Sequence, residues 1–341
     1  MDLAPLLELP SLGDGLSRLE PVLREAVGSG DPFLDEVVTH LIAAGGKRIR
    51  PSLALAAATS RGRRATREDL LGGVTVELVH LASLYHDDVM DEATMRRKVE
   101  SVNARWGNLV AIVAGDYLLA RSAEIAASLG AEIAGLLART LAALCQGQVA
   151  EVQAAFRTDR SEDHYLETIA GKTAALMATS CRIGGLTAGL PSGEVEALTA
   201  FGERFGMLFQ LRDDVLDVMA DAETLGKPPG QDLAEGVYTL PALRALADPH
   251  VGQELGRLLG RPLDVAQRET ARRLVAHSPG LREALAVGRR FAEEAAEATA
   301  GLADRALGRA LQGLTDDLVQ DMEEASACPL APLPQAGEAA S

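Results

Sequence analysis

Residues 70–91 read LLGGVTVELVHLASLYHDDVMD, an apolar, helix-favouring stretch that ends in the pattern Asp-Asp-x-x-Asp. The same pattern ends a second apolar stretch, as DDVLD at residues 213–217. In a helix, residues i and i+4 lie on one face, so Asp87 and Asp91 point the same way, as do their counterparts in the second copy. Like charges placed in this way repel each other, and more strongly where water is excluded. The two stretches therefore predict long helices that each end in a paired acidic face.

A hard divalent cation would offset this repulsion, because such ions prefer oxygen ligands. Mg²⁺ binds through one or two carboxylates together with substrate phosphates, so two acidic clusters facing one cavity indicate several Mg²⁺ ions and a diphosphate. A single copy of the pattern is better explained as a solvated acidic helix end, but two copies on apolar helices favour the metal site. Asp316, Asp317 and Asp321 differ in spacing and lie in a polar stretch, so they are predicted to form a solvated helix face.

The composition limits the classes of partner and compartment. The chain has 341 residues, of which 47% are hydrophobic, and a formal net charge of -16. A polyanion needs a basic surface, so nucleic acid is not expected as a partner. The three cysteines lack metal-ligand spacing and are expected to be buried thiols in a reducing compartment. A secretory signal and an uncharged run of 18 apolar residues are both missing, so we expect no transmembrane helix and a cytoplasmic location.

The predicted fold class is all-α. Ala, Leu, Glu and Arg dominate the chain, and no stretch shows the alternation of a β-strand. A single domain is expected at 13–325, with disordered termini at 1–12 and 326–341. The main predicted helices cover residues 32–44, 51–59, 68–92, 108–129, 131–155, 172–188, 192–219 and 281–324.

The predicted helix boundaries follow from capping residues. Asp31 is predicted to cap a helix that has Pro32 at its first position, and Gly45-Gly46 is predicted to end that helix. Residues 226–236 are rich in Gly and Pro and are predicted to form a loop.

Cationic residues lie near both acidic patterns. Residues 45–51 (GGKRIRP) form a glycine turn with three cations, which suits phosphate oxygens but also fits a solvated basic turn. Arg96-Arg97 follow the first pattern, and Lys227 follows the second. Lys172-Thr173 are predicted to open a helix, where free N–H groups would also bind phosphate. With Gln210 one helical turn before the second pattern, these elements predict a polyphosphate site.

In order and spacing, these motifs resemble the trans-type polyprenyl diphosphate synthases, also called polyprenyl synthetases. The resemblance covers most of residues 40–245. It rests on the segments GGKRIRP (45–51), HDDVMD (86–91), RR (96–97), GDYL (115–118), GKT (171–173), FQLRDDVLD (209–217), GKP (226–228), DL (232–233) and TLP (239–241). It implies an isoprenoid-synthase-type bundle of long helices around a deep central cavity. It also implies head-to-tail condensation of isopentenyl diphosphate onto an allylic diphosphate.

The resemblance assigns roles to individual residues. It implies Mg²⁺ ligands at Asp87, Asp91, Asp213 and Asp217. It implies a catalytic group made of Asp87, Asp88, Asp91, Arg96, Lys172, Asp213 and Asp214. The allylic diphosphate would be held by Arg96, Lys172, Thr173, Gln210 and Lys227, and isopentenyl diphosphate by Lys47, Arg50, His80 and Arg97. Several Mg²⁺ ions, three when diphosphate is bound, a homodimer and a weak membrane association through the product are also implied.

The chemistry of this reaction fits the residue types. The bond from carbon to diphosphate breaks to give an allylic carbocation, and Mg²⁺ and cationic side chains stabilise the leaving group. The released diphosphate is the expected base, and the rest of the cavity should be dry because water would trap the cation. His86 is expected to be structural, since Mg²⁺ prefers oxygen ligands. Without the resemblance, His80 fits a core histidine equally well.

One position departs from the family pattern, and three other functions compete. The family often carries a second lysine where this chain has Val237, so one cation near the allylic diphosphate is missing. A terpene cyclase would share the first acidic pattern, but its second metal motif would mix Asn or Asp with Ser or Thr and Glu. A non-catalytic partner subunit would lack the acidic patterns. The third alternative is a short-chain synthase making farnesyl or geranylgeranyl diphosphate.

The residues before Asp87 bear on product length. Family members with short products often carry bulky aromatics four or five residues before this aspartate, where this chain has Ser83 and Ala82, and Val79 one turn deeper is also modest. The helix from residue 70 to 87 spans about 25 Å, which leaves room for several isoprene units. A long product, heptaprenyl to nonaprenyl, is therefore predicted. The alternative is that a neighbouring residue, around Leu119 or Leu144, closes the cavity earlier.

Overall fold

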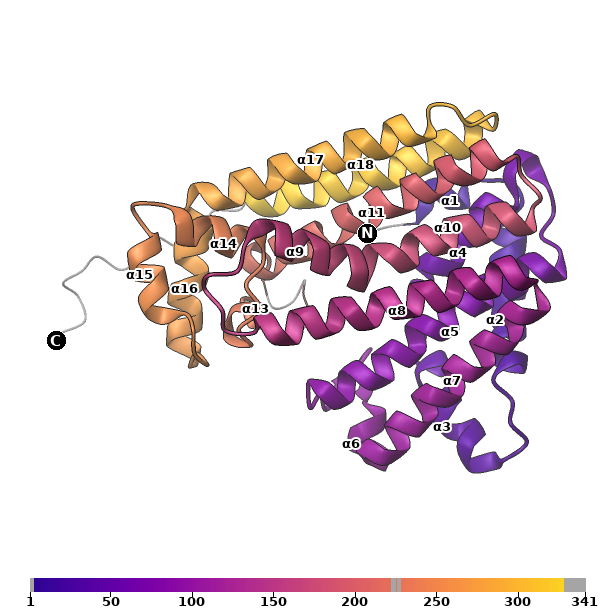
Figure 1. Cartoon of the computed structure of the whole chain (residues 1–341), viewed down its shortest axis with the longest axis horizontal. Coiled ribbons are helices and arrows are strands. Elements are labelled where there is room, and N and C mark those ends of the chain that lie inside the picture. The colour runs from indigo at the N-terminus through magenta and orange to yellow at the C-terminus, as the bar shows by residue number, and fades with distance from the viewer. Residues whose placement is uncertain (1–2, 222–224, 226–227, 328–341) are drawn as a thin grey trace.

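The computed structural model describes residues 3–221, 225 and 228–327, and these form an all-α bundle (Figure 1). The N-terminal half contains α1 (Ala4–Leu7), α2 (Leu12–Ala26), α3 (Pro32–Ala43), α4 (Ile49–Ala58), η1 (Ser60–Gly62), α5 (Arg67–Met90), α6 (Val102–Trp106), α7 (Asn108–Ser128) and α8 (Ala131–Ala154). The C-terminal half contains α9 (Glu162–Ile169), the π-helical η2 (Ala170–Ala174), α10 (Ala175–Thr187), α11 (Ser192–Met219), α13 (Gln231–Ala234), α14 (Leu240–Ala247), α15 (Gly252–Leu258), α16 (Val265–His277), α17 (Pro279–Thr299) and α18 (Arg305–Ala327). A two-residue antiparallel hairpin, β1 (Met95–Arg96) and β2 (Val99–Glu100), adds a small sheet after α5.

The two helices that end in acidic patterns, α5 and α11, both lie inside the bundle. Helix α10 contacts each of them, α5 also packs on α4 and α7, and α11 also packs on α17 and α18. In Figure 1, α17 and α18 run along one edge, and α14, α15 and α16 gather at the end opposite α1 and α2. The helices that carry the acidic patterns are therefore packed within the bundle, and Asp91 at the end of α5 is exposed.

The start of α5 is fixed by a capping box. The backbone N–H of Thr66 donates to Asp69 Oδ2 at 2.7 Å, and the N–H of Asp69 donates back to Thr66 Oγ1 at 3.3 Å. Beyond this cap the helix is apolar on most of its surface, so it is buried on nearly every side. A well-anchored start and a buried body give the acidic end of α5 a fixed position.

The predicted caps of α3 are confirmed. Asp31 Oδ1 accepts hydrogen bonds from the N–H groups of Phe33 and Leu34 at 2.9 and 3.0 Å, and Pro32 is the first helical residue. The helix ends before Gly45-Gly46, which have positive φ angles of 82° and 152°. A side chain at Gly46 would also meet Arg97, because a Cβ there would lie 2.8 Å from its Cζ.

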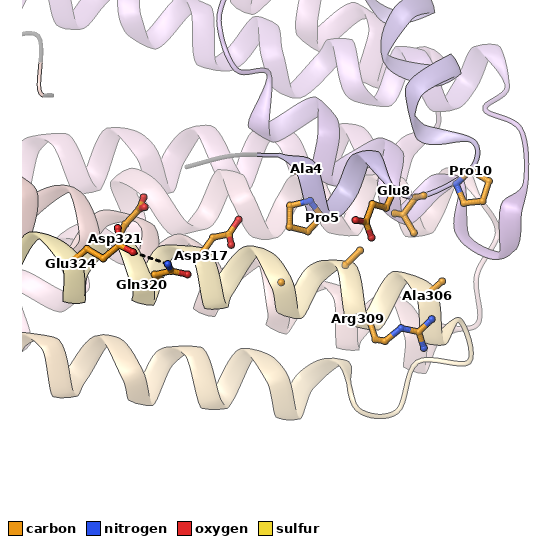
Figure 2. Close-up of a pocket in the computed structure, with 13 residues that line it drawn as sticks. Ala4, Pro5, Glu8, Pro10, Ala306, Arg309, Asp317, Gln320, Asp321 and Glu324 are labelled. Atoms are coloured by element: carbon orange, nitrogen blue, oxygen red, sulfur yellow. Dashed lines mark hydrogen bonds between the residues drawn. The ribbon is translucent and has the colours of Figure 1, made fainter.

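The N-terminus differs from the predicted disorder. Residues 3–12 include α1 and the start of α2, and Leu6 and Leu12 are fully buried. The burial of these leucines explains the order, since each removes a large apolar surface from water. Helix α1 packs on α18, and Figure 2 shows the groove of about 740 Å³ between them, where Glu8 and Arg309 lie across from each other.

The C-terminal third also differs from the prediction. The single helix predicted at 281–324 is two helices, α17 and α18, because the chain turns at residues 300–304. Asp304 caps α18 by accepting hydrogen bonds from the N–H groups of Ala306 and Leu307 at 2.9 and 3.1 Å, and Leu302 is buried in the turn. Helix α18 continues to Ala327, so residues 326 and 327 are helical and not disordered. Residues 328–341 lie outside the described part of the chain.

One further expectation, that the cysteines are buried, needs correction. Cys181 is buried as predicted, but Cys145 is exposed, and Cys328 lies outside the described residues.

Within the part of the chain that the structure describes, α8 is the one helix long and apolar enough to cross a membrane. Only 22% of its apolar window is buried inside the chain. Helix α8 thus presents a broad exposed face of apolar residues.

Candidate active site

Two adjoining cavities lie where α5 and α11 end, and Lys172 lines both of them. The first, here called the apolar cavity, has a volume of about 250 Å³. Its walls are Arg50, Val79, His80, Ser83, Leu84, His86, Asp87, Met90, Leu119, Leu141, Leu144, Cys145, Gln148, Lys172 and Thr173. The second, the polar cavity, has about 550 Å³ and is lined by Lys47, Arg96, Lys172, Gln210, Arg212, Asp213, Asp214, Leu216, Leu225 and Asp232. Charged groups therefore gather at one end of an apolar space.

The aspartates of the first acidic pattern have two different environments. Burial raises the pKa of Asp87 to about 6; the charge of Lys172 opposes this rise and that of Asp91 adds to it. Burial likewise raises the pKa of Asp91. Asp88 lies on another face of α5, is fully buried, and accepts a hydrogen bond from Arg96 Nε at 2.6 Å. A bound cation would therefore stabilise the carboxylates of Asp87 and Asp91, whereas the carboxylate of Asp88 is already paired with Arg96.

The second acidic pattern is joined to the Lys172 segment by a chain of hydrogen bonds. Thr173 Oγ1 donates to Gln210 Oε1 at 2.8 Å, and Gln210 Nε2 donates to Asp214 Oδ1 at 3.0 Å. The other oxygen of Asp214 accepts a hydrogen bond from the hydroxyl of Tyr165. Burial, together with the nearby charge of Asp232, raises the pKa of Asp214 to about 8, although both hydrogen bonds oppose the rise. Asp214 therefore links α9 and η2 to α11.

The other two aspartates of this pattern lie differently. Asp213 lines the polar cavity and pairs with Arg212, whose Nη1 is 2.8 Å from its Oδ1. Arg212 also binds Asp321 of α18 at 2.6 Å, so Asp321 is paired and only partly solvated, whereas Asp316 is exposed as predicted. Asp217 is buried, and its Oδ2 accepts a hydrogen bond from the N–H of Asp232 at 3.2 Å. Of the pair predicted to share a face, Asp213 alone lines the polar cavity.

The predicted ligands of isopentenyl diphosphate divide between the cavities. Arg50 and His80 line the apolar cavity, and Lys47 lines the polar cavity. Arg97 packs on the glycine turn and donates through Nη1 to the carbonyl oxygens of Leu41, at 3.2 Å, and Gly45. Burial, with Arg50 and Arg97 nearby, lowers the pKa of His80 well below its ordinary value, so this imidazole is neutral at pH 7.

Two predictions about this site are changed by the structure, and a third is not tested by it. Lys172 does not open a helix, because α9, η2 and α10 run on continuously, so side chains and not a helix start would hold a phosphate. Ala82 is buried in the main core and does not line the apolar cavity, whereas Val79 and Ser83 do. Lys227 lies outside the described residues.

His86 is positioned by backbone groups of α7. Its Nε2 lies 3.2 Å from the carbonyl oxygen of Ile112, and a Cβ at Gly115 would come within 2.3 Å of the same nitrogen. These contacts agree with a structural role for His86.

Sequence reasoning missed two residues of the site. Glu151 of α8 pairs with the ammonium group of Lys172 and adds negative charge near Asp87. Burial disfavours the charge of Lys172, but Glu151 and the first acidic pattern outweigh it and raise its pKa. Tyr165 was the second omission. A lone glutamate and a lone tyrosine carry no spacing signal, but Gly147 does mark the close approach of α8, since a Cβ there would lie 2.5 Å from the backbone N of Lys172.

The acidic residues suit Mg²⁺ held jointly with a substrate. Among the described residues, no three acidic, histidine or cysteine side chains converge on one point. Mg²⁺ does not require such a cage, because it keeps several waters and shares its ligands with phosphates. The raised pKa of Asp87 indicates a carboxylate that a nearby cation would stabilise. Asp87 and Asp91 on one side and Asp213 on the other fit this form of binding.

Comparison with known proteins identifies the family. The sequence profile of the polyprenyl synthetases matches residues 31–275. The chain belongs to the polyprenyl synthetase family. It is 37% identical to the nonaprenyl diphosphate synthase of Mycobacterium tuberculosis, over 93% of this chain and 95% of that protein. It is 39% identical to component 2 of the heptaprenyl diphosphate synthase of Geobacillus stearothermophilus, over 85% of this chain and 91% of that protein.

A solved structure agrees with the fold. The polyprenyl synthase of Caulobacter crescentus, in complex with calcium and isoprenyl diphosphate, superposes with a TM-score of 0.85 at 31% identity, covering 93% of this chain and 97% of that one. This polyprenyl synthetase is therefore an all-α trans-prenyltransferase.

Proposed function

We propose that this polyprenyl synthetase adds isopentenyl diphosphate head-to-tail to an allylic diphosphate and makes a long-chain all-trans polyprenyl diphosphate. The observation that carries the proposal is the position of Lys172 between the two cavities. A diphosphate near Lys172 would place its prenyl chain in the apolar cavity and its charges beside the aspartates. The long-chain products named for the two relatives support the same class of product.

Each side of the site has a separate task in this proposal. Lys172, Thr173 and Gln210 hold the allylic diphosphate, with Arg96 close by through its pair with Asp88. Lys47, Arg50, His80 and Arg97 hold isopentenyl diphosphate. Since His80 is neutral, it contributes a hydrogen bond and not a charge. The apolar walls exclude water from the allylic carbocation.

Several Mg²⁺ ions, three when diphosphate is bound, are proposed at Asp87, Asp91, Asp213 and Asp217. When bound, they would neutralise the diphosphate as it leaves. Because Asp217 is buried against the backbone of Asp232, we expect it to orient the loop beside the polar cavity as well. After the double bond of isopentenyl diphosphate has attacked the allylic cation, the released diphosphate accepts a proton from the product cation, and this step completes each addition.

An incubation with labelled isopentenyl diphosphate and each of three starters, dimethylallyl, geranyl and farnesyl diphosphate, tests the proposal. Products resolved by chain length should reach heptaprenyl to nonaprenyl. Failure to extend any starter would contradict the proposed reaction. A cyclic hydrocarbon would support a terpene cyclase, and activity that appears only with another protein would support a partner-subunit role.

A short-chain product is the main alternative, and one observation favours it. Leu119, Leu141 and Leu144 line the apolar cavity opposite Val79 and Ser83, so α7 and α8 narrow the space that α5 leaves open. A volume of about 250 Å³ must widen before it holds a long chain. These leucines are only partly buried and can change rotamer, which supports widening.

We also propose a homodimer in which a second copy covers α7 and α8. These helices contact each other and expose Leu109, Ile112, Val113, Val149 and Val152. Exposed apolar side chains on two neighbouring helices support an interaction site there. The same face explains why α8 has the composition of a membrane span. The cytoplasmic location remains a prediction.

The dimer is tested by placing charge on that face. A Val149→Glu and Val152→Glu double variant should elute as a monomer in light-scattering chromatography, because two buried carboxylates without partners cost several kcal/mol. Val265→Glu, at an exposed position on α16, is the matched control and should leave the dimer intact. A double variant with the mass of the wild type would contradict the proposed interface.

The missing family lysine gives a second test. The N–H of Val237 donates to the carbonyl oxygen of Asp232 at 2.8 Å, so position 237 lies next to a wall of the polar cavity. Val237→Lys should lower the Michaelis constant for the allylic starter roughly tenfold through a charge-assisted hydrogen bond. Val265→Lys adds the same charge elsewhere and should change nothing. An unchanged constant would mean that another cation already fills the role.

A further inference from the structure

A buried glutamate lies beneath the cations proposed to bind isopentenyl diphosphate. Glu77 is on α5, one turn before His80, and is 1% exposed. Its Oε1 accepts a hydrogen bond from Arg48 Nη1 at 2.8 Å. A buried carboxylate is costly unless it is paired, so its position indicates a specific use.

Arg48 connects this glutamate to the glycine turn. Its backbone is left-handed, with φ 51° and ψ 38°, at the residue just before α4 begins. A residue with a side chain pays roughly 1 kcal/mol or more for this conformation. Its guanidinium is held by Glu77, by Glu20 at 3.2 Å and by the carbonyl oxygen of Ile42 at 3.2 Å. These contacts fix the turn that carries Lys47.

Arg48, Arg50 and Arg97, here called the arginine cluster, have a surplus of positive charge. Glu77 is the buried carboxylate that acts on all three, whereas Glu20 is partly exposed. Arg50 Nε is buried, and no acceptor among the described residues reaches it. Burial lowers the pKa of Arg50 to about 10, and the charge of Glu77 opposes that shift. The cluster is therefore only partly neutralised before an anion binds.

We propose that Glu77 is a positioning residue for isopentenyl diphosphate: it is the resident counterion that holds the arginine cluster in place until the diphosphate arrives. This inference rests on the proposed function for the identity of the anion. Once bound, the diphosphate supplies negative charge to the same guanidinium groups. The carboxylate therefore stabilises the free protein more than the diphosphate complex.

Thermodynamic linkage gives the direction of the effect. Glu77→Gln removes the charge but keeps an oxygen that can accept the hydrogen bond from Arg48. Removal of the charge should favour the complex relative to the free protein, so the variant should bind diphosphate more tightly than the wild type. An increase in affinity of about tenfold is expected, which is the usual size of such a coupling.

The experiment uses inorganic diphosphate as the probe, with EDTA present so that metal cannot recruit it to the aspartates. Calorimetry gives the dissociation constant, and thermal unfolding gives the stabilisation by the probe. Glu77→Gln should bind diphosphate more tightly than the wild type and gain more stability on binding than the wild type does. Glu77→Asp keeps the charge and should bind like the wild type. Glu25→Gln removes an exposed carboxylate that pairs with Arg67, outside the arginine cluster, and should also bind like the wild type.

The outcomes separate the two proposals. An affinity of Glu77→Gln that is unchanged or weaker overturns the counterion role, because a purely structural carboxylate would not improve binding. If Glu77→Gln fails to fold alone, refolding with diphosphate present should rescue it, and failure to fold under both conditions overturns the role as well. The proposed prenyl transfer is measured separately on the wild type, so its failure would leave the binding result interpretable.

Discussion

Asp87→Ala and Asp213→Ala should each reduce turnover at least about a hundredfold at saturating Mg²⁺, with the fold retained. Each substitution removes a carboxylate from one side of the site, and a metal ion held by it would no longer neutralise the leaving diphosphate. The two sides act on one diphosphate, so the double variant should lose little more than either single variant.

Turnover is measured with labelled isopentenyl diphosphate at several Mg²⁺ concentrations. Asp316→Ala is the matched control, since this exposed aspartate bonds only Gln312 among the contacts described, and it should keep full activity. Near-normal turnover of either Asp87→Ala or Asp213→Ala would remove the metal assignment.

Removing the charge of Asp87 should lower activity but raise the stability of the metal-free protein. The pKa of Asp87 is about 6 in the folded chain, above its ordinary 3.8, so this carboxyl binds its proton more tightly when folded. Its contribution to stability is complete below about pH 4 and is lost as the pH rises through 6. Asp87→Asn should therefore stabilise the metal-free protein at pH 7 by on the order of 1 kcal/mol after solvent screening, and not at pH 4. Denaturant unfolding in EDTA at both pH values measures the difference.

Ser83→Phe should shorten the product from heptaprenyl or longer to farnesyl or geranylgeranyl diphosphate. Ser83 lines the apolar cavity one turn before Asp87, on the path that a growing chain would follow along α5. One helical turn is about 5.4 Å, close to the length of an isoprene unit, so a phenyl ring here leaves room for few units.

Two further variants make the product-length test specific. Ser83→Ala changes the residue without adding bulk and should keep the long product. Leu144→Ala enlarges the opposite wall on α8 and should lengthen the product if the leucines limit it. A wild type that already stops at farnesyl or geranylgeranyl would show that the leucines, and not the residues of α5, form the floor.

Periodicity and local capping were enough to predict the long helices. Residues 192–219 form a helix with the predicted bounds, and Asp31 caps α3 as expected. Errors arose where tertiary contacts decide the structure. The short α1 is held by the burial of Leu6, and the turn between α17 and α18 depends on Asp304, which also binds the N–H of Arg61 from a distant segment.

The sequence predicted which site residues share a face of one helix, but not which residues meet between helices. The separation of Asp87 from Asp88 follows from 3.6 residues per turn. The partners across helices do not, because Tyr165 reaches Asp214 over 49 positions and Glu151 reaches Lys172 over 21. The pairing of Arg212 with Asp321, 109 positions apart, was equally hidden, so a partly buried contact was predicted to be part of a solvated face.

The π-helical segment at residues 170–174 constrains how this chain can vary. A π turn holds one more residue than an α turn, so it acts as a one-residue insertion within a continuous helix. Deleting a single residue there would restore regular α geometry and leave Tyr165 and the core face of α10 in nearly the same relative orientation, because the π turn spreads its extra residue over about one turn. A relative that is α-helical at this place therefore aligns with this chain only if one residue is gapped within 170–174. An alignment without that gap would pair residues that differ by about 100° around the helix and point in different directions.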